Sequence, residues 1–309
     1  RGHRLLRQQC RRDAVANERR EGIALLKRKL VARVHLVGAG LDVAARPRDR
    51  IDLLLDRGTP WLEISTLCGL GCHDDDGGAS ASGGGRISGI GIVGGIRACI
   101  DASDSAIKGG AATPYGLDKC LRLQQIALEN KLPYIQLVES AGANLLRQAD
   151  LFVKGGATFA NLARLSAAGC PVISVVHGSS TAGGAYQPGL SDYVIVVRGK
   201  TKIFLAGPPL LKAATGEIST DEVLGGAEMH ATVSGLAEWI AEDDRDAIRL
   251  ARALTDKLKW DRAPPASTAP KPLYDPEEIL GVVPPDYRKP YDVREVIARI
   301  VDGSDWLDF

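Results

Sequence analysis

One stretch of the chain, residues 175–186, constrains the fold more than any other. It reads VVHGSSTAGGAY, in which residues typical of a buried strand run into small residues, with Gly183 and Gly184 side by side. Backbone N–H groups at the start of a helix have no acceptor within the helix, and the helix dipole adds partial positive charge there. A strand that ends in glycines before a helix therefore predicts a place where the main chain holds an anionic oxygen.

A second stretch of the same kind lies about forty residues earlier in the chain. Residues 134–145 read YIQLVESAGANL, again a strand pattern followed by small residues, here Gly142 and Ala143. Two such turns can direct N–H donors at one oxygen, as a developing enolate or tetrahedral intermediate requires. Taken singly, each turn is equally compatible with a plain tight connection.

Strand and helix patterns alternate along the middle of the chain. We expect strands at residues 134–138, 171–176 and 193–197, and helices at 117–130, 159–168 and 243–258. Residues 86–100 alternate like paired strands, residues 46–63 contain a short helix, and residues 73–85 read as a loop. Repeated strand-then-helix units predict an α/β layer fold.

Composition excludes several classes of protein. The 309 residues are 45% hydrophobic, which is enough for a large core, and the formal net charge is +1. That charge argues against nucleic acid as the main partner. No apolar run approaches the roughly twenty residues that a membrane-spanning helix needs, so we expect no membrane span.

The cysteines predict neither a disulfide framework nor a metal centre. All six are scattered along the chain, which favours reduced thiols. Cys68, Cys72 and His73 lie close in sequence, but a structural zinc site needs four well-spaced ligands and no second Cys/His pair is near. We therefore expect no metal site.

At the two glycine turns the sequence resembles the carboxyltransferase β subunits of biotin-dependent acyl-CoA carboxylases, the propionyl-, methylcrotonyl- and long-chain acyl-CoA carboxylase group. Further matching segments follow in order along most of the chain: RPRDRIDLLLD (46–56), DSAIKGG (104–110), FLAGPPLLKAATGE (204–217), LGGAEMH (224–230), LGVVPP (280–285) and YDVREVIARIVDG (291–303). One departure is Ala141, where relatives commonly carry a second glycine. The resemblance implies a crotonase-like ββα superhelix.

The resemblance also implies a domain organisation. Residues 1–45 would be an N-terminal helical arm, with a solvated helix expected at 17–31. Residues 46–262 would form the N-terminal carboxyltransferase domain, and residues 263–309 a linker and the start of a second, C-terminal domain that the sequence does not include. In the family, the active site lies between the N-terminal domain of one protomer and the C-terminal domain of another.

The resemblance assigns roles to small residues rather than to an acid–base pair. The expected reaction moves a carboxyl group from carboxybiotin to the α-carbon of an acyl-CoA through an enolate. The expected oxyanion donors are the backbone N–H groups of Gly183 and Gly184, with Gly142 and Ala143 in the neighbouring turn. The residues expected to bind the CoA ester are Lys108, Gly109, Gly110 and Ala182. His177 and His230 are expected to be packed, hydrogen-bonded side chains rather than general bases.

Partners and alternatives complete the expectation. Biotin would be carried by a partner α subunit with biotin carboxylase and carboxyl carrier functions, and the β subunits would form an oligomer, expected to be a hexamer. A bacterial cytoplasmic location is expected, with the mitochondrial matrix as the alternative. Two other functions stay open: a one-domain crotonase-type hydratase or decarboxylase, for which Glu139 is the only acid close to either turn, and a noncatalytic acyl-CoA-binding scaffold. The acyl-chain length stays open.

Overall fold

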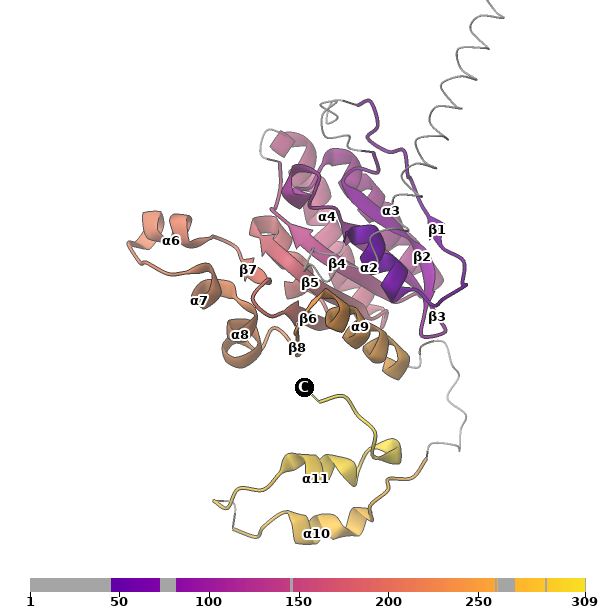
Figure 1. Ribbon diagram of the computed structural model, residues 1–309, viewed down its shortest axis with the longest axis vertical. Coiled ribbons are helices and arrows are strands. Elements are labelled where there is room, and N and C mark those ends of the chain that lie inside the picture. Colours follow the sequence, from indigo (N-terminus) through magenta and orange to yellow (C-terminus); the bar gives the residue numbers. More distant parts are fainter. Residues whose placement is uncertain are drawn as a thin grey trace, which may run out of the picture. The chain divides into compact units, whose positions relative to one another are not determined.

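The computed structural model of the protein describes residues 46–72, 82–144, 147–258, 260, 270–286 and 288–308. The helix expected at 17–31 and most of the loop expected at 73–85 lie outside these ranges. Within them, one eight-stranded sheet has the strand order β1-β2-β3-β4-β5-β6-β8, and β7 pairs with β5 beyond this path (Figure 1). The expected α/β class is therefore confirmed.

The sheet is antiparallel at one side and parallel over the rest. The antiparallel strands are β1 (Leu62–Glu63), β2 (Arg86–Val93) and β3 (Ile96–Ser103). Parallel pairings join β3 to β4 (Tyr134–Ser140) and β4 to β5 (Val172–Thr181). Strand β5 pairs in turn with β6 (Tyr193–Val197) and with β7 (Lys202–Phe204), and β6 pairs with β8 (Trp239–Ala241). Parallel strands covered on both faces read as continuous apolar runs, which is why β4, β5 and β6 begin within one residue of their predicted starts. Strand β5 continues five residues beyond its predicted end at residue 176.

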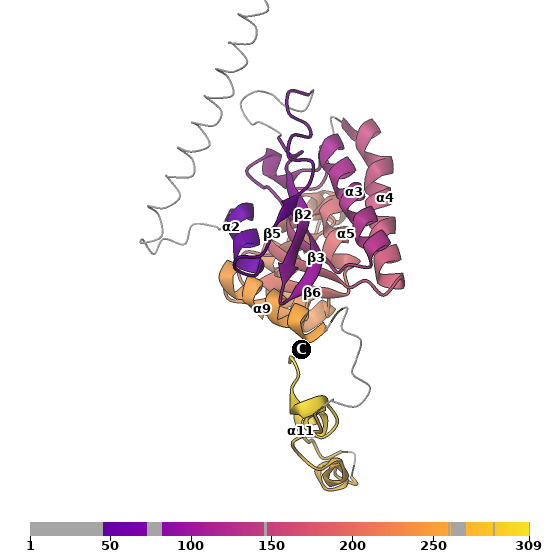
Figure 2. The same cartoon turned by 90° about the vertical axis from the view of Figure 1, so that its right-hand side faces the viewer.

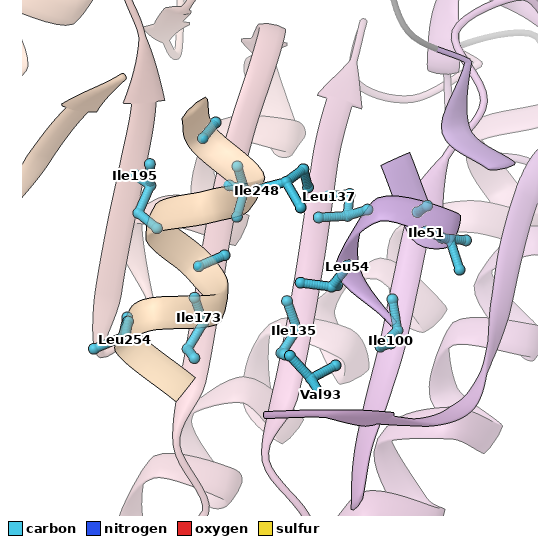
Figure 3. Packing of buried hydrophobic residues seen from close by; sticks show 14 of the residues in the cluster. Ile51, Leu54, Val93, Ile100, Ile135, Leu137, Ile173, Ile195, Ile248 and Leu254 are labelled. Atoms are coloured by element: carbon cyan, nitrogen blue, oxygen red, sulfur yellow. The ribbon is translucent and has the colours of Figure 1, made fainter. Parts of the chain in front are cut away.

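Helices cover both faces of the sheet (Figure 2). On one face lie α2 (Pro47–Leu54) and α9 (Asp244–Leu258), whose apolar side chains pack on alternate residues of β3 to β6. Figure 3 shows Leu54 of α2 and Ile248 of α9 among the isoleucines of these strands. On the other face lie α3 (Pro114–Asn130) and α4 (Gln148–Ala167), packed on Tyr134 and Val172.

Shorter helices follow the second half of the sheet. They are α5 (Tyr186–Gly189), α6 (Pro208–Thr215), α7 (Asp221–Gly225), α8 (Ala227–Met229), α10 (Ile279–Val282) and α11 (Val293–Ala298). The 3₁₀ segments are η1 (Lys108–Gly110), η3 (Ala182–Ala185), η5 (Pro276–Glu278) and η6 (Asp302–Ser304), and η4 (His230–Ser234) is a π-helical turn. Among the described residues no helix is both long and apolar enough to cross a membrane.

One helix boundary differs clearly from the prediction. Helix α4 begins at Gln148, whereas the sequence pattern predicts a start at residue 159. Gly155 and Gly156 lie in the missed part, and glycine costs a helix interior about 1 kcal/mol relative to alanine. Burial of Leu151 on the same helix, at 1% exposure, offsets that propensity, because packing commonly overrides it.

Candidate active site

Three segments meet at the carboxyl ends of β4 and β5. We call residues 141–144, after β4, the first turn, and residues 181–184, which begin at the last residue of β5, the second turn; residues 107–112 form the Lys108 loop. The Ala141 N–H donates to the Gly109 carbonyl at 3.1 Å. A Cβ built on Gly142 would lie 3.1 Å from the Cβ of Ala182. The two predicted turns and the predicted CoA-binding loop are therefore neighbours.

A bulge in β5 brings the second turn to this position. The β4–β5 register pairs Val138 with Val176 and next pairs Ser140 with Ser180. Between these pairs β4 advances by two residues and β5 by four, so β5 carries extra residues there. Before the bulge β5 pairs with β6, and from Ser179 it pairs with β7. Bulges bend strands and redirect the chain beyond them, and they are enriched beside active sites.

Most main-chain groups of the first turn are already bonded. The buried Gly142 N–H donates to Ser140 Oγ at 3.2 Å, and the Gly142 carbonyl accepts from the Ala112 N–H at 2.8 Å. The Asn144 N–H donates to the Ala112 carbonyl at 3.4 Å. Ala143 and Ala112 form a parallel bridge, in which the N–H of Ala143 itself faces away from Ala112. Ala143 is therefore the donor that this turn can offer to a ligand.

The second turn opens a short 3₁₀ helix, η3, with Thr181 as its N-cap residue. In a 3₁₀ helix each N–H donates to the carbonyl three residues earlier, so the Gly184 N–H is directed at the Thr181 carbonyl. Ala182 and Gly183 precede this first bond, and their N–H groups have no acceptor within the helix. Exposed Ala182 has a φ of +50°.

Gly183 leaves space beside the main chain. A Cβ built on Gly183 meets only Phe159 Cζ, at 3.8 Å, among the described residues within 4 Å. Phe159 of α4 packs against Tyr186, with ring centroids 4.9 Å apart, and Tyr186 is 45% exposed. Buried Gly184, by contrast, faces Ser140, whose Oγ would lie 2.9 Å from an added Cβ. A ligand can therefore occupy the space beside Gly183 but not that beside Gly184.

The Lys108 loop is held in a left-handed backbone conformation. Lys108, Gly109 and Gly110 have φ values of +50°, +66° and +74°. A Cβ on Gly110 would overlap the carbonyl oxygen of Glu139, so only glycine allows this approach to β4. Gly109 is exposed and lies against Ala141. An ammonium beside exposed main chain is a suitable partner for a phosphate.

Beside the turns lies a largely buried network of titratable side chains, which we call the bulge network: Arg50, Glu139, His177 and Asp244. Arg50 donates to Glu139 Oε2 at 2.9 Å and to Asp244 Oδ2 at 3.0 Å, and His177 Nδ1 lies 3.0 Å from Asp244 Oδ1. Burial lowers the pKa of His177. Burial opposes ionisation of Asp244, but hydrogen bonds from His177 and Arg50 outweigh it and hold its pKa well below the ordinary value.

Both histidines are packed and hydrogen-bonded, as expected. His177 is 2% exposed and bonds to Asp244. Its partner carboxylate is ionised and only accepts, so His177 carries its proton on Nδ1. His230 is 8% exposed, and its two ring nitrogens lie 2.9 Å from Ser234 Oγ and 2.8 Å from the Ile203 carbonyl oxygen. Both ring nitrogens of His230 are thus already occupied by neighbours.

Several residues of the site escaped the sequence prediction. Ser140 and Ser180 bond the main chain of the two turns, Ser180 Oγ donating to the Gly184 carbonyl at 2.9 Å. Their position directly beside the small residues was an available signal. Arg50 and Asp244 lie far from the turns in sequence, and only the placement of Arg50 inside the RPRDRIDLLLD segment marked it.

The described part of the chain contains no group of three or more His, Cys, Asp or Glu side chains placed to hold a metal ion. Cys68 and Cys72 are half-buried and free, and burial raises the pKa of the Cys68 thiol. His73 lies outside the described residues.

Comparisons with known proteins agree with this geometry. The carboxyl transferase domain family matches residues 44–309. The chain is 52% identical over 264 residues to the probable biotin-dependent acyl-coenzyme A carboxylase beta2 subunit of Mycobacterium tuberculosis, covering 85% of this chain and 49% of that protein. It is 47% identical to the mitochondrial methylcrotonoyl-CoA carboxylase beta chain of Dictyostelium discoideum, covering 85% of this chain and 45% of that one.

Solved structures give the same result. The β subunit of Pseudomonas aeruginosa geranyl-CoA carboxylase is 55% identical, with a TM-score of 0.68 over 96% of this chain and 54% of that one. Transcarboxylase 12S with bound methylmalonyl-coenzyme A is 30% identical, with a TM-score of 0.74 over 85% of this chain and 51% of that one. The expected crotonase-like fold is thereby confirmed. The chain spans about half the length of these relatives. By sequence, fold and the two glycine turns, the chain belongs to the carboxyl transferase domain family.

Proposed function

We propose that the chain is the N-terminal domain of the carboxyltransferase β subunit of a biotin-dependent acyl-CoA carboxylase. Its reaction would move a carboxyl group from carboxybiotin to the α-carbon of an acyl-CoA. The observation that carries the proposal is the proximity of the first and second turns, since a Cβ built on Gly142 would lie 3.1 Å from the Cβ of Ala182 and 3.8 Å from the Gly183 nitrogen. Relatives named as β subunits of acyl-CoA carboxylases support it.

The chemical task of this domain would be to stabilise an oxyanion. Removing the α-proton of an acyl-CoA thioester leaves an enolate, whose negative charge gathers on the thioester oxygen. Main-chain N–H groups of Gly183 and Ala143 would donate to such an oxygen, with Ala182 and Gly184 shaping the second turn around it. Donors that are already oriented need no reorganisation during the reaction, and losing one typically costs about 2.7–4 kcal/mol of barrier stabilisation.

Binding of the CoA ester would fall to the Lys108 loop. Lys108 would neutralise CoA phosphates, while exposed Gly109 and buried Gly110 keep the main chain close to the first turn. Ala182 would complete the cradle from the second turn. The absence of a Cβ at Gly183 leaves room for an acyl group beside Phe159.

Among the described residues, the acid nearest to either turn in sequence is already engaged by another side chain. Glu139, the nearest acid in sequence, is held by Arg50 at 2.9 Å on the face of the sheet that α2 and α9 cover. This pairing favours carboxyl transfer over the hydratase alternative.

The partners follow from the same proposal. Carboxybiotin, carried by a partner α subunit with biotin carboxylase and carrier functions, would supply the carboxyl group. The β subunits would assemble as a hexamer, the assembly described for transcarboxylase 12S. The proposed location is the bacterial cytoplasm, with the mitochondrial matrix as the alternative, since relatives come from both bacteria and mitochondria.

The direct test uses the reverse half-reaction, which does not need the partner subunit. The full-length protein carrying these residues would be incubated with free biotin and, in turn, the carboxylated forms of propionyl-, methylcrotonyl- and geranyl-CoA. We expect biotin-dependent loss of the carboxyl group from one of the three esters. Chromatography of the CoA esters over time would measure this loss. The preferred ester would also identify the acyl chain.

Other outcomes would decide against the proposal. Loss of carboxylate at the same rate without biotin would indicate a decarboxylase. Saturable binding of all three esters without any conversion, even with a carboxylated partner subunit present, would indicate a noncatalytic binding protein.

A further inference from the structure

The bulge of β5 lies against side chains of the bulge network. His177 and Gly178 belong to the extra residues of β5, between the paired positions Val176 and Ser180. Glu139 lies opposite them on β4, and a Cβ on Gly178 would lie 3.0 Å from Glu139 Oε1. The Glu139 side chain therefore covers the bulge directly, and the first turn begins two residues further along β4.

The network links β4 and β5 through two helices: β4 is bonded to α2, α2 to α9, and α9 to β5. Arg50 of α2 bonds to Glu139 on β4 and to Asp244 on α9, and Asp244 bonds in turn to His177 on β5. The side chains of Arg50, His177 and Asp244 are 2%, 0% and 7% exposed, and that of Glu139 is 24% exposed. Movement of one strand end relative to the other would break at least one of these bonds.

This network is also less complete than the other large buried charged cluster of the protein. In that cluster the Asp101 carboxylate accepts from Arg86 at 2.6 Å, from Ser88 at 2.7 Å and from Tyr134 at 3.0 Å. In the bulge network, Arg50 Nε and His177 Nε2 are buried and have no hydrogen-bond partner among the described residues. Buried polar atoms without partners cost about 1–3 kcal/mol each.

An incompletely satisfied buried network is a poor stabilising device, because replacing buried ion pairs by apolar side chains is often neutral or favourable. Its location beside the two turns gives it another role. We infer that the bulge network positions the main-chain donors: Glu139 and Asp244 are positioning residues that set the distance between the first and second turns. The kinetic part of this inference rests on the proposed carboxyl transfer.

The test compares two carboxylates that each bind an arginine of the helices on the same face. Glu139→Gln removes the charge that holds Arg50, and Asp56→Asn removes the charge that holds Arg252 of α9 at 2.7 Å. Asp56 also accepts from the Gly94 and Gly95 N–H groups, at the β2–β3 hairpin and away from the turns. Both variants lose one partly buried ion pair, so Asp56→Asn is the matched control.

Two readouts on the full-length protein are needed: reverse carboxyl transfer with the preferred ester, and amide hydrogen exchange of peptides covering residues 139–144 and 178–185. For Glu139→Gln we expect kcat to fall about 10–100-fold with KM changed little, because a displacement of about 1 Å can cost that much. Exchange in both peptides should speed up. Asp56→Asn should lower the melting temperature while its kcat and its exchange in both peptides stay at wild-type values.

A second variant, Asp244→Asn, should reproduce the kcat loss if it folds; if it does not fold, the more exposed Glu139 carries the test. Wild-type kcat and wild-type exchange in Glu139→Gln would overturn the inference. If the wild-type protein converts none of the esters, the proposed function fails, and the exchange of the two peptides still decides whether the network positions the turns.

Discussion

The first and second turns have similar sequences but differ in how their main chains are used. In the first turn, Gly142 donates to Ser140 and accepts from Ala112, which leaves Ala143 as the available donor. In the second turn, Ala182 and Gly183 precede the first bond of a 3₁₀ helix, and Gly183 has open space at its side. The first turn is thus held by its own hydrogen bonds, and we call it the braced turn. The second turn has N–H groups and space left for a ligand, and we call it the open turn.

The two turns therefore have different tasks, structural support and ligand binding, although their sequence patterns are alike. The braced turn connects the Lys108 loop to β4 and holds the contact with Ala182. The open turn presents N–H groups that no part of its own helix uses. We therefore expect changes in the open turn to affect turnover, and changes in the braced turn to affect folding stability first.

The largest expected effect is on the open turn. Gly183→Val should lower carboxyl transfer by about 10²–10³-fold, because the branched side chain blocks the approach to an oxyanion donor. The fold should tolerate it, since an added Cβ meets only Phe159 at 3.8 Å. Initial rates and thermal unfolding would be measured beside Gly189→Val, where an added Cβ meets nothing within 4 Å. A normal rate for Gly183→Val would remove the assignment of this donor.

The next effect is on the braced turn. Gly142→Ala should lower the free energy of unfolding by about 1–3 kcal/mol, because a φ of +91° strains any residue with a Cβ and the methyl group would press on Ala182. Urea denaturation monitored by circular dichroism would measure this. Unchanged stability together with lost turnover would mean that the first turn is not braced in the way described.

A smaller effect separates substrate binding from turnover. Lys108→Gln should raise KM for the acyl-CoA about tenfold and lower kcat less, because a hydrogen bond to a charged group contributes about 1.5–3 kcal/mol. The difference from wild type should shrink as salt is added, since salt screens the attraction to CoA phosphates. Steady-state kinetics at low and high salt would measure both. An equal KM for the two proteins at low salt would exclude Lys108 from CoA binding.

The smallest effect is the pH dependence of stability from the bulge network. Because the pKa of His177 is lowered from 6.5 in the folded state, the unfolded chain binds its proton more readily. The free energy of unfolding should therefore fall as the pH drops below 6.5. The pKa of Asp244 is lowered as well, so the stability that its ionised form adds is lost only as the pH falls below the ordinary value of 3.8.

Between pH 3.8 and pH 6.5, the expected change in the free energy of unfolding comes from His177 and not from Asp244. His177→Asn keeps a donor toward Asp244 but does not titrate, so its stability should depend less on pH there. Urea denaturation at several pH values would compare the two proteins. Parallel pH profiles would show that His177 does not contribute in this way.

The sequence allowed strands β2 to β6 and both turns to be predicted, but not the short strands β1, β7 and β8, and the physical reasons are local. Parallel buried strands are continuous apolar runs, and strand-to-helix turns that approach a ligand need small residues. The pairings of the bulge network were not predictable, because Arg50 and Asp244 are 194 residues apart and Arg50 and Glu139 are 89 apart. The use of the Gly142 N–H by Ser140 also depends on three-dimensional geometry that no spacing rule expresses.

The most direct test of the central claim is a crystal structure of the full-length protein with a non-reactive thioether analogue of its acyl-CoA that retains the carbonyl, and with biotin. We predict that the carbonyl oxygen of the acyl-CoA analogue or of biotin lies about 2.7–3.1 Å from the Gly183 nitrogen, the range of an oxyanion donor. We also predict that the CoA phosphates lie beside Lys108. Both ligands bound with neither oxygen within hydrogen-bond distance of Gly183 or Ala143 would contradict the assignment of the two turns as oxyanion donors.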